Sequence, residues 1–200
     1  MKLYQYDEKD GSAFSEALID YLYTSGKSVP ASLLNGESPE IKKGEHGKPY
    51  FSGPELRDVF FSRSHTQGCE VACFSDDEVG VDCENTCARK GRKPDFENVA
   101  RRFFTTDEQE YIAYGEPGAE ERFFEVWTAK EAYMKYTGNG FSEGFQSFSV
   151  FNLHDAEIKT RRLEGAPHII CSVCNRRSGE DGLFTFQQGR KGRKGDRPHG

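Results

Sequence analysis

The amino-acid sequence predicts an α+β fold made of two related halves, although no internal sequence repeat is visible. Two observations support this prediction. Apolar residues recur at helical spacing in several stretches, and runs typical of β-strands stand between and after those stretches. Helices and strands are therefore expected in each half. We place the first half at residues 1–98, the second at 99–186, and a disordered basic tail at 187–200.

The first half is expected to open with an amphipathic helix. Apolar side chains recur at helical spacing from Phe14 to Leu22, after Ser12, which is a good N-cap residue. Gly26 favours a stop soon after the last of them. Residues 38–54 are rich in Gly and Pro and are predicted to form a loop.

A set of strands follows in the first half. The polar turn at residues 75–78 separates the last two runs, which indicates an antiparallel meander. The runs that we expect to form strands are residues 58–62, 69–74 and 79–84.

The second half begins with helices. Helical spacing follows Pro94, and Thr106 with Gln109 has the pattern of a capping box that opens a short helix. A long helix is expected from about residue 120 to 137, closed by Gly138 and Gly140. Residues 145–153 and 168–173 are predicted to be later strands.

Composition excludes several classes of protein. The chain has 200 residues, 16 of them Phe, so it can bury a core, and its 30% charged content does not prevent collapse. No run approaches the roughly 18 apolar residues of a membrane span, and the polar N-terminus lacks a signal-peptide core. We therefore expect a cytoplasmic protein that does not bind membranes.

Charge and cysteine content argue against nucleic-acid binding, a structural zinc site and disulfides. Residues 187–200 carry a local charge of +4 in a chain whose net charge is −6, so the body has −10 and should repel nucleic acid. Cys171 and Cys174 resemble half of a zinc site, but a structural zinc needs four ligands. Reduced thiols are the better interpretation of the 6 cysteines in a chain without a secretion signal.

Two carboxylates are expected side by side on the last strand of the first half. Side chains at i and i+2 of a strand share a face, so Asp82 and Glu84 lie on one face while Val81 and Cys83 point to the other. The pair is suited to bind a cation through oxygen. The alternative is an exposed strand face with two solvated acids.

The long helix places a third carboxylate among apolar residues. Glu131 falls on one stripe with Phe124, Trp127 and Met134. An inward carboxylate needs a counter-charge or a metal. If Glu131 meets Asp82 and the neighbouring acid, like charges would repel by roughly 1 to 4 kcal/mol per pair, which a divalent cation would relieve. Oxygen ligands favour Mg²⁺.

Other polar residues have two interpretations each. Lys130 and Lys135 flank Glu131, and Lys135 lies at i+4, where a simple helix ion pair is the alternative to a catalytic role. Ser64 and His65 follow a strand and are suited to hold a phosphate, although a single loop histidine is more often structural. Glu108 would ordinarily be an acid that favours the helix dipole.

Taken in order, these segments resemble the long, surfactin-activating class of 4'-phosphopantetheinyl transferases over about half of the chain. The signature Trp-x-x-Lys-Glu-Ala-x-x-Lys, at residues 127–135, is highly specific. Residues 26–34 contain Lys27 as their single basic residue, where members of this family usually have several. The other matching segments are Gly-Lys-Pro at 47–49, the strand ending in Ser-His at 61–66, Gly-x-Asp-x-Glu at 80–84 and Arg-Phe-Phe-x-x-x-Glu at 102–108.

The resemblance implies a fold and a set of site residues. It implies two pseudo-twofold halves with coenzyme A in the cleft between them. Lys135 would reach the pyrophosphate, and either Glu131 or Glu108 would take the proton from the carrier serine through a water. The implied Mg²⁺ or Mn²⁺ ligands are Asp82, Glu84 and Glu131, and the implied coenzyme contacts are Lys48, Ser64, His65, Lys130 and Lys135.

The implied reaction moves phosphopantetheine from coenzyme A to a serine of an apo acyl, polyketide or peptidyl carrier protein. Because both halves of the cleft are encoded in one chain, a monomer is expected. Two alternatives remain open. One is a metal-dependent phosphoesterase, in which the same acids activate water. The other is a catalytically silent module that binds carrier domains.

Overall fold

The computed structural model describes residues 1–6, 12–87, 95–140, 144–177 and 185–188 of the chain. The described part has a mixed α and β architecture, as the sequence predicts. Of the expected tail, Gln187 and Gln188 belong to a strand, and residues 189–200 lie outside the described residues.

Strands and helices follow one another in groups along the chain. In chain order the elements are β1 (Lys2–Tyr6), α1 (Ala13–Thr24), α2 (Ala31–Leu34), β2 (Ile41–Lys43), β3 (Pro49–Phe51), the 3-10 helix η1 (Pro54–Leu56), β4 (Phe60–Thr66), β5 (Cys69–Ser75), β6 (Val79–Asn85), α3 (Phe96–Phe103), α4 (Thr106–Ile112), α5 (Ala119–Thr137), the 3-10 helix η3 (Phe145–Ser147), β7 (Ala156–Leu163), β8 (Ala166–Arg176) and β9 (Thr185–Gln188).

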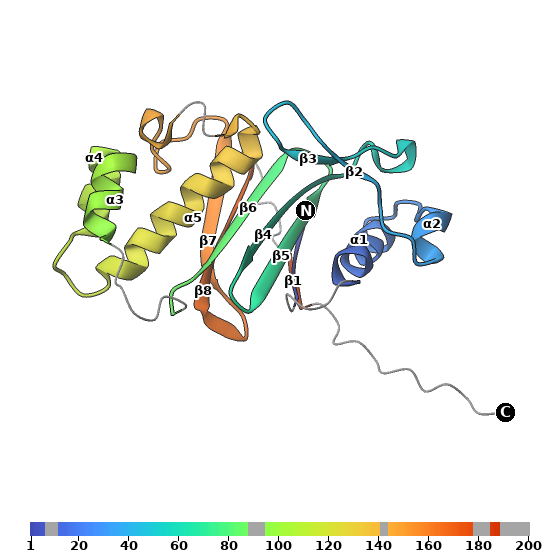
Figure 1. Ribbon diagram of the computed structural model, residues 1–200, viewed down its shortest axis with the longest axis horizontal. Helices are drawn as coiled ribbons and strands as arrows, with labels where there is room; N and C mark the ends of the chain where they lie inside the picture. The colour runs from blue at the N-terminus through green and yellow to red at the C-terminus, as the bar shows by residue number, and fades with distance from the viewer. Residues whose placement is uncertain (7–11, 88–94, 141–143, 178–184, 189–200) are drawn as a thin grey trace.

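The strands form two main sheets and a small hairpin. One sheet has the order β4-β5-β1-β9, the other has the order β6-β8-β7, and β2 pairs with β3. Strand β1 runs antiparallel to β5 and parallel to β9, so the far end of the described chain returns to the first sheet. Helix α5 lies across the sheet of β6, β7 and β8, whereas α1 and α2 lie beside the other sheet (Figure 1).

Four apolar clusters lie in the described part of the chain, and three of them show how the layers pack. Leu18, Tyr21 and Phe74 join α1 to the first sheet. A second cluster, which includes Val71 of β5 and Val81 of β6, fills the space between the sheets on the faces turned away from α1 and α5. The third packs α3 and α4 against α5 through aromatic rings, among them Phe103 of α3 and Trp127 of α5 with centroids 6.4 Å apart.

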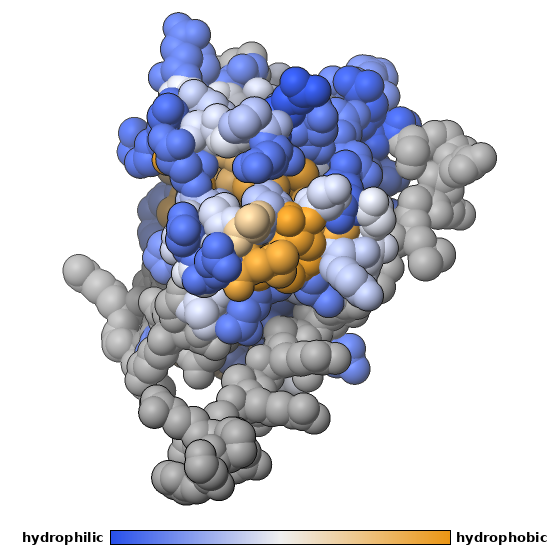
Figure 2. All heavy atoms as spheres, turned by 90° about the vertical axis from the view of Figure 1, so that its right-hand side faces the viewer, coloured by the Kyte–Doolittle hydropathy of each residue, from blue (hydrophilic) through white to orange (hydrophobic). Residues whose placement is uncertain are grey.

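The apolar side chains are not all covered. Figure 2 shows an apolar area on the side of the molecule where α1 and α2 lie, surrounded by hydrophilic surface. Leu34, at the end of α2, is 66% exposed. Within the part of the chain that the structure describes, no helix combines the length and the apolar character that crossing a membrane requires.

Most helix predictions are confirmed, with one shift. Helix α1 begins after Ser12, and α5 ends at Gly138 in the left-handed conformation. The capping box of α4 is formed by Thr105 and Glu108, one residue before the expected pair, because the carboxylate of Glu108 accepts the backbone N–H of Thr105 at 2.8 Å. This shift assigns Glu108 a structural role.

Three predictions about the loop and strands of the first half are wrong in part. The expected loop at 38–54 contains the short hairpin of β2 and β3. Strand β4 continues to Thr66, so Ser64 and His65 lie on a strand. The meander also fails, because β6 pairs with β8 from the second half of the chain instead of with β5.

The segment 145–153 forms η3 and turns instead of the predicted strand, and β7 was not predicted. The reason lies in its backbone hydrogen bonds. The carbonyls of Phe145 and Phe148 accept from the ammonium of Lys130, and the N–H of Val150 donates to Glu108. These groups are therefore engaged by a buried ion pair and cannot join a strand ladder.

Candidate active site

The carboxylate of Asp82 lies at the centre of the candidate site. Strand alternation holds as predicted, because Val81 and Cys83 belong to the apolar cluster between the sheets while Asp82 points the other way. Asp82 is 7% exposed, and its Oδ1 accepts hydrogen bonds from Ser64 Oγ and Lys135 Nζ, each at 2.8 Å. A buried carboxylate with these two donors is held in a defined orientation.

Helix α5 reaches Asp82 because Gly80 lets strand and helix approach closely. A Cβ atom on Gly80 would overlap the carbonyl of Ala132 and would lie 2.5 Å from the backbone nitrogen of Tyr136. The glycine of the Gly-x-Asp-x-Glu segment is therefore needed for packing. Its effect is to bring the acids of β6 within reach of the side chains of α5.

Glu131 projects from α5 toward the acids of β6. Burial, together with the negative charges of Asp82 and Glu84, raises the pKa of Glu131 to about 7, against the opposing effect of the Lys135 ammonium. The three carboxylates thus share one electrostatic environment, as the sequence analysis expected. Glu131 is partly buried and titrates close to neutral pH.

The donor set of Asp82, Glu84 and Glu131 suits a hard divalent cation, because it consists of oxygen atoms with excess negative charge. In the described ranges, no group of three or more His, Cys, Asp or Glu side chains is gathered closely enough to hold a metal ion as it stands. The cation that contacts Asp82 is the ammonium of Lys135. Metal binding by these residues stays a prediction.

Lys135 makes its contacts with strands instead of with its own helix. Its Nζ donates to Asp82, to the carbonyl of Val81 at 3.0 Å and to the carbonyl of Arg63 at 3.4 Å. The ion pair is therefore a bridge from α5 to β6, in place of the surface pair with Glu131 that the i+4 spacing allowed. The Lys135 side chain keeps 32% of its surface exposed.

A cavity of about 280 Å³ adjoins these side chains. Its walls include Lys48 from the loop before β3, Arg63 from β4, and Glu131 and Lys135 from α5. The ammonium of Lys48 pairs with Glu78 and donates to the carbonyl of Tyr136 at 2.7 Å. Lys48 thereby ties the end of α5 to the loop before β6 and lies at the edge of the cavity.

A second cavity of about 360 Å³ lies over the neighbouring face of β4. His65 is exposed and lines it together with Lys43 and Arg63. The guanidinium of Arg63 stacks over the ring of Phe14, with its central carbon 4.4 Å from the centroid, and its Nε donates to Glu70 at 2.9 Å. Arg63 lines both cavities and so connects them.

The opposite face of β4 carries a ladder of hydroxyl groups, which we call the hydroxyl ladder. β6 uses one edge to pair with β8, and the other edge faces β4 without main-chain pairing. Hydroxyl groups on every second residue of β4 lie along this edge and accept the N–H groups of every second residue of β6. The hydroxyls of Ser62, Ser64 and Thr66 accept the backbone N–H groups of Val81, Cys83 and Asn85 at 3.0, 3.3 and 3.1 Å, respectively.

Sequence reasoning missed the ladder. The alternation of Ser62, Ser64 and Thr66 was not recognised, although hydroxyl residues at every second position of a strand are a visible pattern. Ser64 was expected to contact a phosphate, and the structure instead buries it, with 8% exposure, against Asp82.

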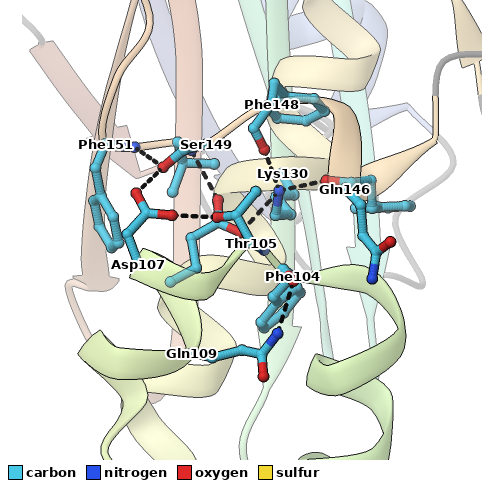
Figure 3. Close-up of polar contacts among 12 residues, drawn as sticks. Phe104, Thr105, Asp107, Gln109, Lys130, Gln146, Phe148, Ser149 and Phe151 are labelled. Carbon is cyan, nitrogen blue, oxygen red and sulfur yellow. Dashed lines mark hydrogen bonds and ion pairs between the residues drawn. The ribbon is translucent and has the colours of Figure 1, made fainter.

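Lys130 and Glu108 form a separate buried ion pair and do not join the site. The side chains of both are 0% exposed, and Lys130 Nζ lies 2.9 Å from Glu108 Oε2. The same ammonium donates to the carbonyls of Phe145 and Phe148 at 2.6 and 2.7 Å, and it lies 4.2 Å from the centroid of the Phe148 ring. Figure 3 shows Lys130 enclosed in this way, with Phe148 on one side and Thr105 on the other.

This burial corrects two assignments. Lys130 cannot contact a coenzyme phosphate, because its ammonium is enclosed by Glu108 and the two carbonyls. Glu108 cannot act as a base through a water, because its oxygens accept the N–H groups of Thr105 and Val150 and the charge of Lys130. Desolvation lowers the pKa of Lys130, and the charge of Glu108 opposes that shift. The role of the pair is structural.

The cysteines are buried or distant from the site chemistry. Cys171 and Cys174 lie in the protein interior as free thiols, and burial raises the pKa of each. Thiols of raised pKa are poor nucleophiles and poor metal ligands.

Comparison with known proteins points to one group of enzymes. A family model described as the 4'-phosphopantetheinyl transferase superfamily matches residues 78–182. The chain is 31% identical over 115 residues to the 4'-phosphopantetheinyl transferase Sfp of Bacillus subtilis (strain 168), covering 57% of this chain and 48% of that relative. It is 32% identical over 117 residues to the 4'-phosphopantetheinyl transferase psf-1 of Bacillus pumilus, covering 58% and 47%.

A third relative, the 4'-phosphopantetheinyl transferase gsp of Aneurinibacillus migulanus, is 33% identical over 120 residues, with 58% of this chain and 46% of the relative covered. The chain therefore spans about half the length of the curated relatives that it matches. The matched family region contains β6 and α5, which carry the carboxylates of the candidate site.

Proposed function

This chain belongs to the 4'-phosphopantetheinyl transferase superfamily, and we propose that it transfers the 4'-phosphopantetheine group of coenzyme A to a serine of an apo carrier protein. The products are the modified carrier and adenosine 3',5'-bisphosphate. The observation that carries the proposal is the convergence of Asp82, Glu131 and Lys135 beside a cavity of about 280 Å³. Acids and an ammonium in this arrangement are suited to a pyrophosphate group.

Asp82, Glu84 and Glu131 are the residues that would hold Mg²⁺ or Mn²⁺. When bound, such a cation neutralises charge on the pyrophosphate and orients it. The supporting observation is the donor set itself, since the negative charges of Asp82 and Glu84 both raise the pKa of Glu131, against the opposing ammonium of Lys135. Hard oxygen donors of this kind select Mg²⁺ and Mn²⁺.

Lys135 would stabilise the leaving group. The serine oxygen of the carrier attacks the phosphorus next to the pantetheine, and the bond from that phosphorus to the bridging oxygen of the pyrophosphate breaks. Charge then grows on the departing oxygen. Lys135 lines the cavity, and its ammonium can meet this charge by exchanging its longest contact, the 3.4 Å hydrogen bond to the carbonyl of Arg63, for the departing oxygen.

Glu131 would take the proton of the carrier serine through a water. Its pKa of about 7 makes it a competent base near neutral pH, because it is mostly deprotonated slightly above that value and still binds a proton firmly. Glu108, the other candidate in the sequence, is enclosed in its ion pair with Lys130. The proposal therefore assigns the base to Glu131 alone.

The adenosine end of coenzyme A would extend toward the second cavity, over β4. Lys43 and Arg63, which is paired with Glu70, bring cationic side chains to this cavity, and the imidazole of His65 lines it as well. Lys27 is the single basic residue of the segment 26–34. The cavity over β4 therefore offers the cationic side chains that this segment lacks, and Lys48 lies at the boundary between the two regions.

Mass spectrometry of an apo carrier domain tests the proposal. The chain is incubated with coenzyme A, Mg²⁺ and an acyl, a polyketide or a peptidyl carrier in separate reactions. We expect a mass gain of one phosphopantetheine group on at least one carrier, and no gain in excess EDTA. Release of free phosphopantetheine without a modified carrier would indicate a phosphoesterase instead, and binding without any product would indicate a silent carrier-binding module.

The proposed enzyme is a monomer, since α5 and β6, which carry the site, are parts of one chain. Light scattering of the active preparation measures this directly, and an obligate trimer would contradict it.

A further inference from the structure

The hydroxyl of Ser64 is engaged on both sides. A serine hydroxyl has one hydrogen to donate and two lone pairs to accept with. Ser64 donates its hydrogen to Asp82 Oδ1 at 2.8 Å and accepts the backbone N–H of Cys83 at 3.3 Å. Ser64 is 8% exposed and contributes to the wall of the cavity over β4, so its two hydrogen bonds, and not its distance from the cavity, keep its hydroxyl from a ligand. A phosphate oxygen could receive a hydrogen bond from Ser64 only if the bond to Asp82 were broken.

We propose that Ser64 is a positioning residue, which orients the carboxylate of Asp82 for the divalent cation and does not bind a phosphate of the coenzyme. This inference rests on the proposed function, because it concerns the same cation. In the described part of the chain, both hydrogen bonds of the Asp82 side chain end on Oδ1. Oδ2 is thereby left to meet a cation, in an orientation that Ser64 and Lys135 fix from the other oxygen.

The hydroxyl ladder provides the physical basis for this role. Ser62, Ser64 and Thr66 all dock β4 against β6 in the same way, each accepting one N–H of β6. Ser64 differs because the residue beside its partner amide is Asp82, whose carboxylate it also contacts. One hydroxyl therefore fixes the strand that carries the ligand and the ligand itself. Removing a hydrogen-bond partner of a metal ligand typically lowers the affinity for the metal by about 10- to 100-fold.

The ladder also contains a matched control. Ser62 accepts the N–H of Val81 at 3.0 Å, is 4% exposed, and lies two residues from Ser64 on the same face of the same strand. Ser62→Ala and Ser64→Ala each leave one buried amide of β6 without its partner. Both variants should therefore lose stability by the same mechanism, with melting temperatures lowered by about 2 to 8 °C. Only Ser64→Ala also releases Asp82.

Coenzyme A binding, measured by calorimetry with the full chain, separates positioning from phosphate contact. Each protein is titrated with coenzyme A once in excess EDTA and once in saturating Mg²⁺. For Ser64→Ala we expect an unchanged Kd for coenzyme A in EDTA. The factor by which Mg²⁺ tightens coenzyme A binding, which we call the Mg²⁺ enhancement, should be about 10- to 100-fold smaller than in the wild type. Ser62→Ala should keep the wild-type enhancement. The variant Ser64→Thr, which retains the hydroxyl, should restore most of it.

The other outcomes are decisive as well. If Ser64→Ala weakens coenzyme A binding equally in EDTA and in Mg²⁺, Ser64 is a phosphate contact and the inference is overturned. Equal effects of Ser62→Ala and Ser64→Ala on the Mg²⁺ enhancement would reduce Ser64 to a general structural role. If Ser64→Ala does not fold, Ser64→Thr still tests the inference, since a folded Ser64→Thr protein without the enhancement contradicts it.

The wild-type protein separates this inference from the proposed function. If wild-type binding of coenzyme A does not respond to Mg²⁺, the metal assignment of the proposed function fails, and the role of Ser64 fails with it. If the wild-type protein responds and Ser64→Ala responds equally, the inference alone is wrong.

Discussion

Two lysines on α5, Lys130 and Lys135, have opposite environments. Five positions along an α-helix correspond to a rotation of about 140°, so the two side chains leave the helix in different directions. Lys130 is 0% exposed and pairs with the equally buried Glu108, whereas Lys135 keeps 32% of its side-chain surface exposed and pairs with Asp82. One short motif therefore contributes to the interior and to the candidate site at once.

The difference teaches that burial, more than the presence of an ion pair, decides what a charged side chain does. Lys130 is surrounded by Glu108 and two backbone carbonyls, so it connects α4, α5 and the segment of Phe148. Removing one member of such a pair leaves an uncompensated buried charge. Lys135 faces a cavity, so water and a ligand can replace its contacts at lower cost.

The largest effect is expected for Lys130→Met. The substitution leaves the Glu108 carboxylate buried without its counter-charge, and we expect the free energy of unfolding to fall by about 3 to 5 kcal/mol. Urea denaturation followed by tryptophan fluorescence measures the loss, because Trp127 packs in the same region. A loss below 1 kcal/mol would show that the pair is of minor importance for the fold.

Lys135→Met should have the next largest effect, and on a different quantity. If its ammonium neutralises charge on the leaving oxygen, turnover on an apo carrier should fall by roughly 10² to 10³, or about 2.7 to 4 kcal/mol in the activation barrier. The free energy of unfolding should change by about 1 kcal/mol or less, because this pair is partly solvated. Wild-type turnover in this variant would remove Lys135 from the catalytic residues and leave the carboxylates as assigned.

Glu131→Gln should change how stability depends on pH. Burial and the charge of Asp82 raise the pKa of Glu131 from 4.5 to about 7 in the folded protein. The folded state therefore binds this proton more tightly than the unfolded state, and the stability due to Glu131 is lost as pH rises from about 4.5 through 7. In EDTA, the Gln variant should match the wild type at pH 4 and exceed its free energy of unfolding at pH 8 by on the order of 1 to 3 kcal/mol.

Thermal or urea unfolding of both proteins across this pH range makes the measurement. Parallel curves for wild type and Glu131→Gln would show that the proton affinity of Glu131 is not raised by folding.

The smallest effect is expected when the buried pair is replaced as a unit. In Lys130→Met with Glu108→Leu, both charges disappear and their volume is filled with apolar atoms, which is often neutral or stabilising for buried pairs. We expect the free energy of unfolding to return to within about 1 kcal/mol of the wild-type value. Carrier modification should persist in the folded double variant, since neither residue lines the cavity of the candidate site. Loss of transfer in a stable double variant would reopen a functional role for the pair.

The sequence by itself determined the parts of the site that depend on local periodicity. The period of two along β6 puts Asp82 and Glu84 on one face, and the period of 3.6 along α5 puts Glu131 among apolar residues. Both expectations agree with the structure, in which Asp82 and Glu84 raise the pKa of Glu131. The start of α1 and the end of α5 were also predictable, since α1 begins after Ser12 and Gly138 takes the left-handed conformation that ends α5.

Tertiary structure decided which distant groups meet. Lys130 and Glu108 lie 22 positions apart, and no periodicity in either helix shows that each neutralises the other. The same holds for the docking of β4 on β6 through Ser64, and for the pairing of β6 with β8. The physical reason is that a buried charge or an unpaired amide takes whichever partner the packing of layers brings within about 3 Å, and packing depends on the whole chain.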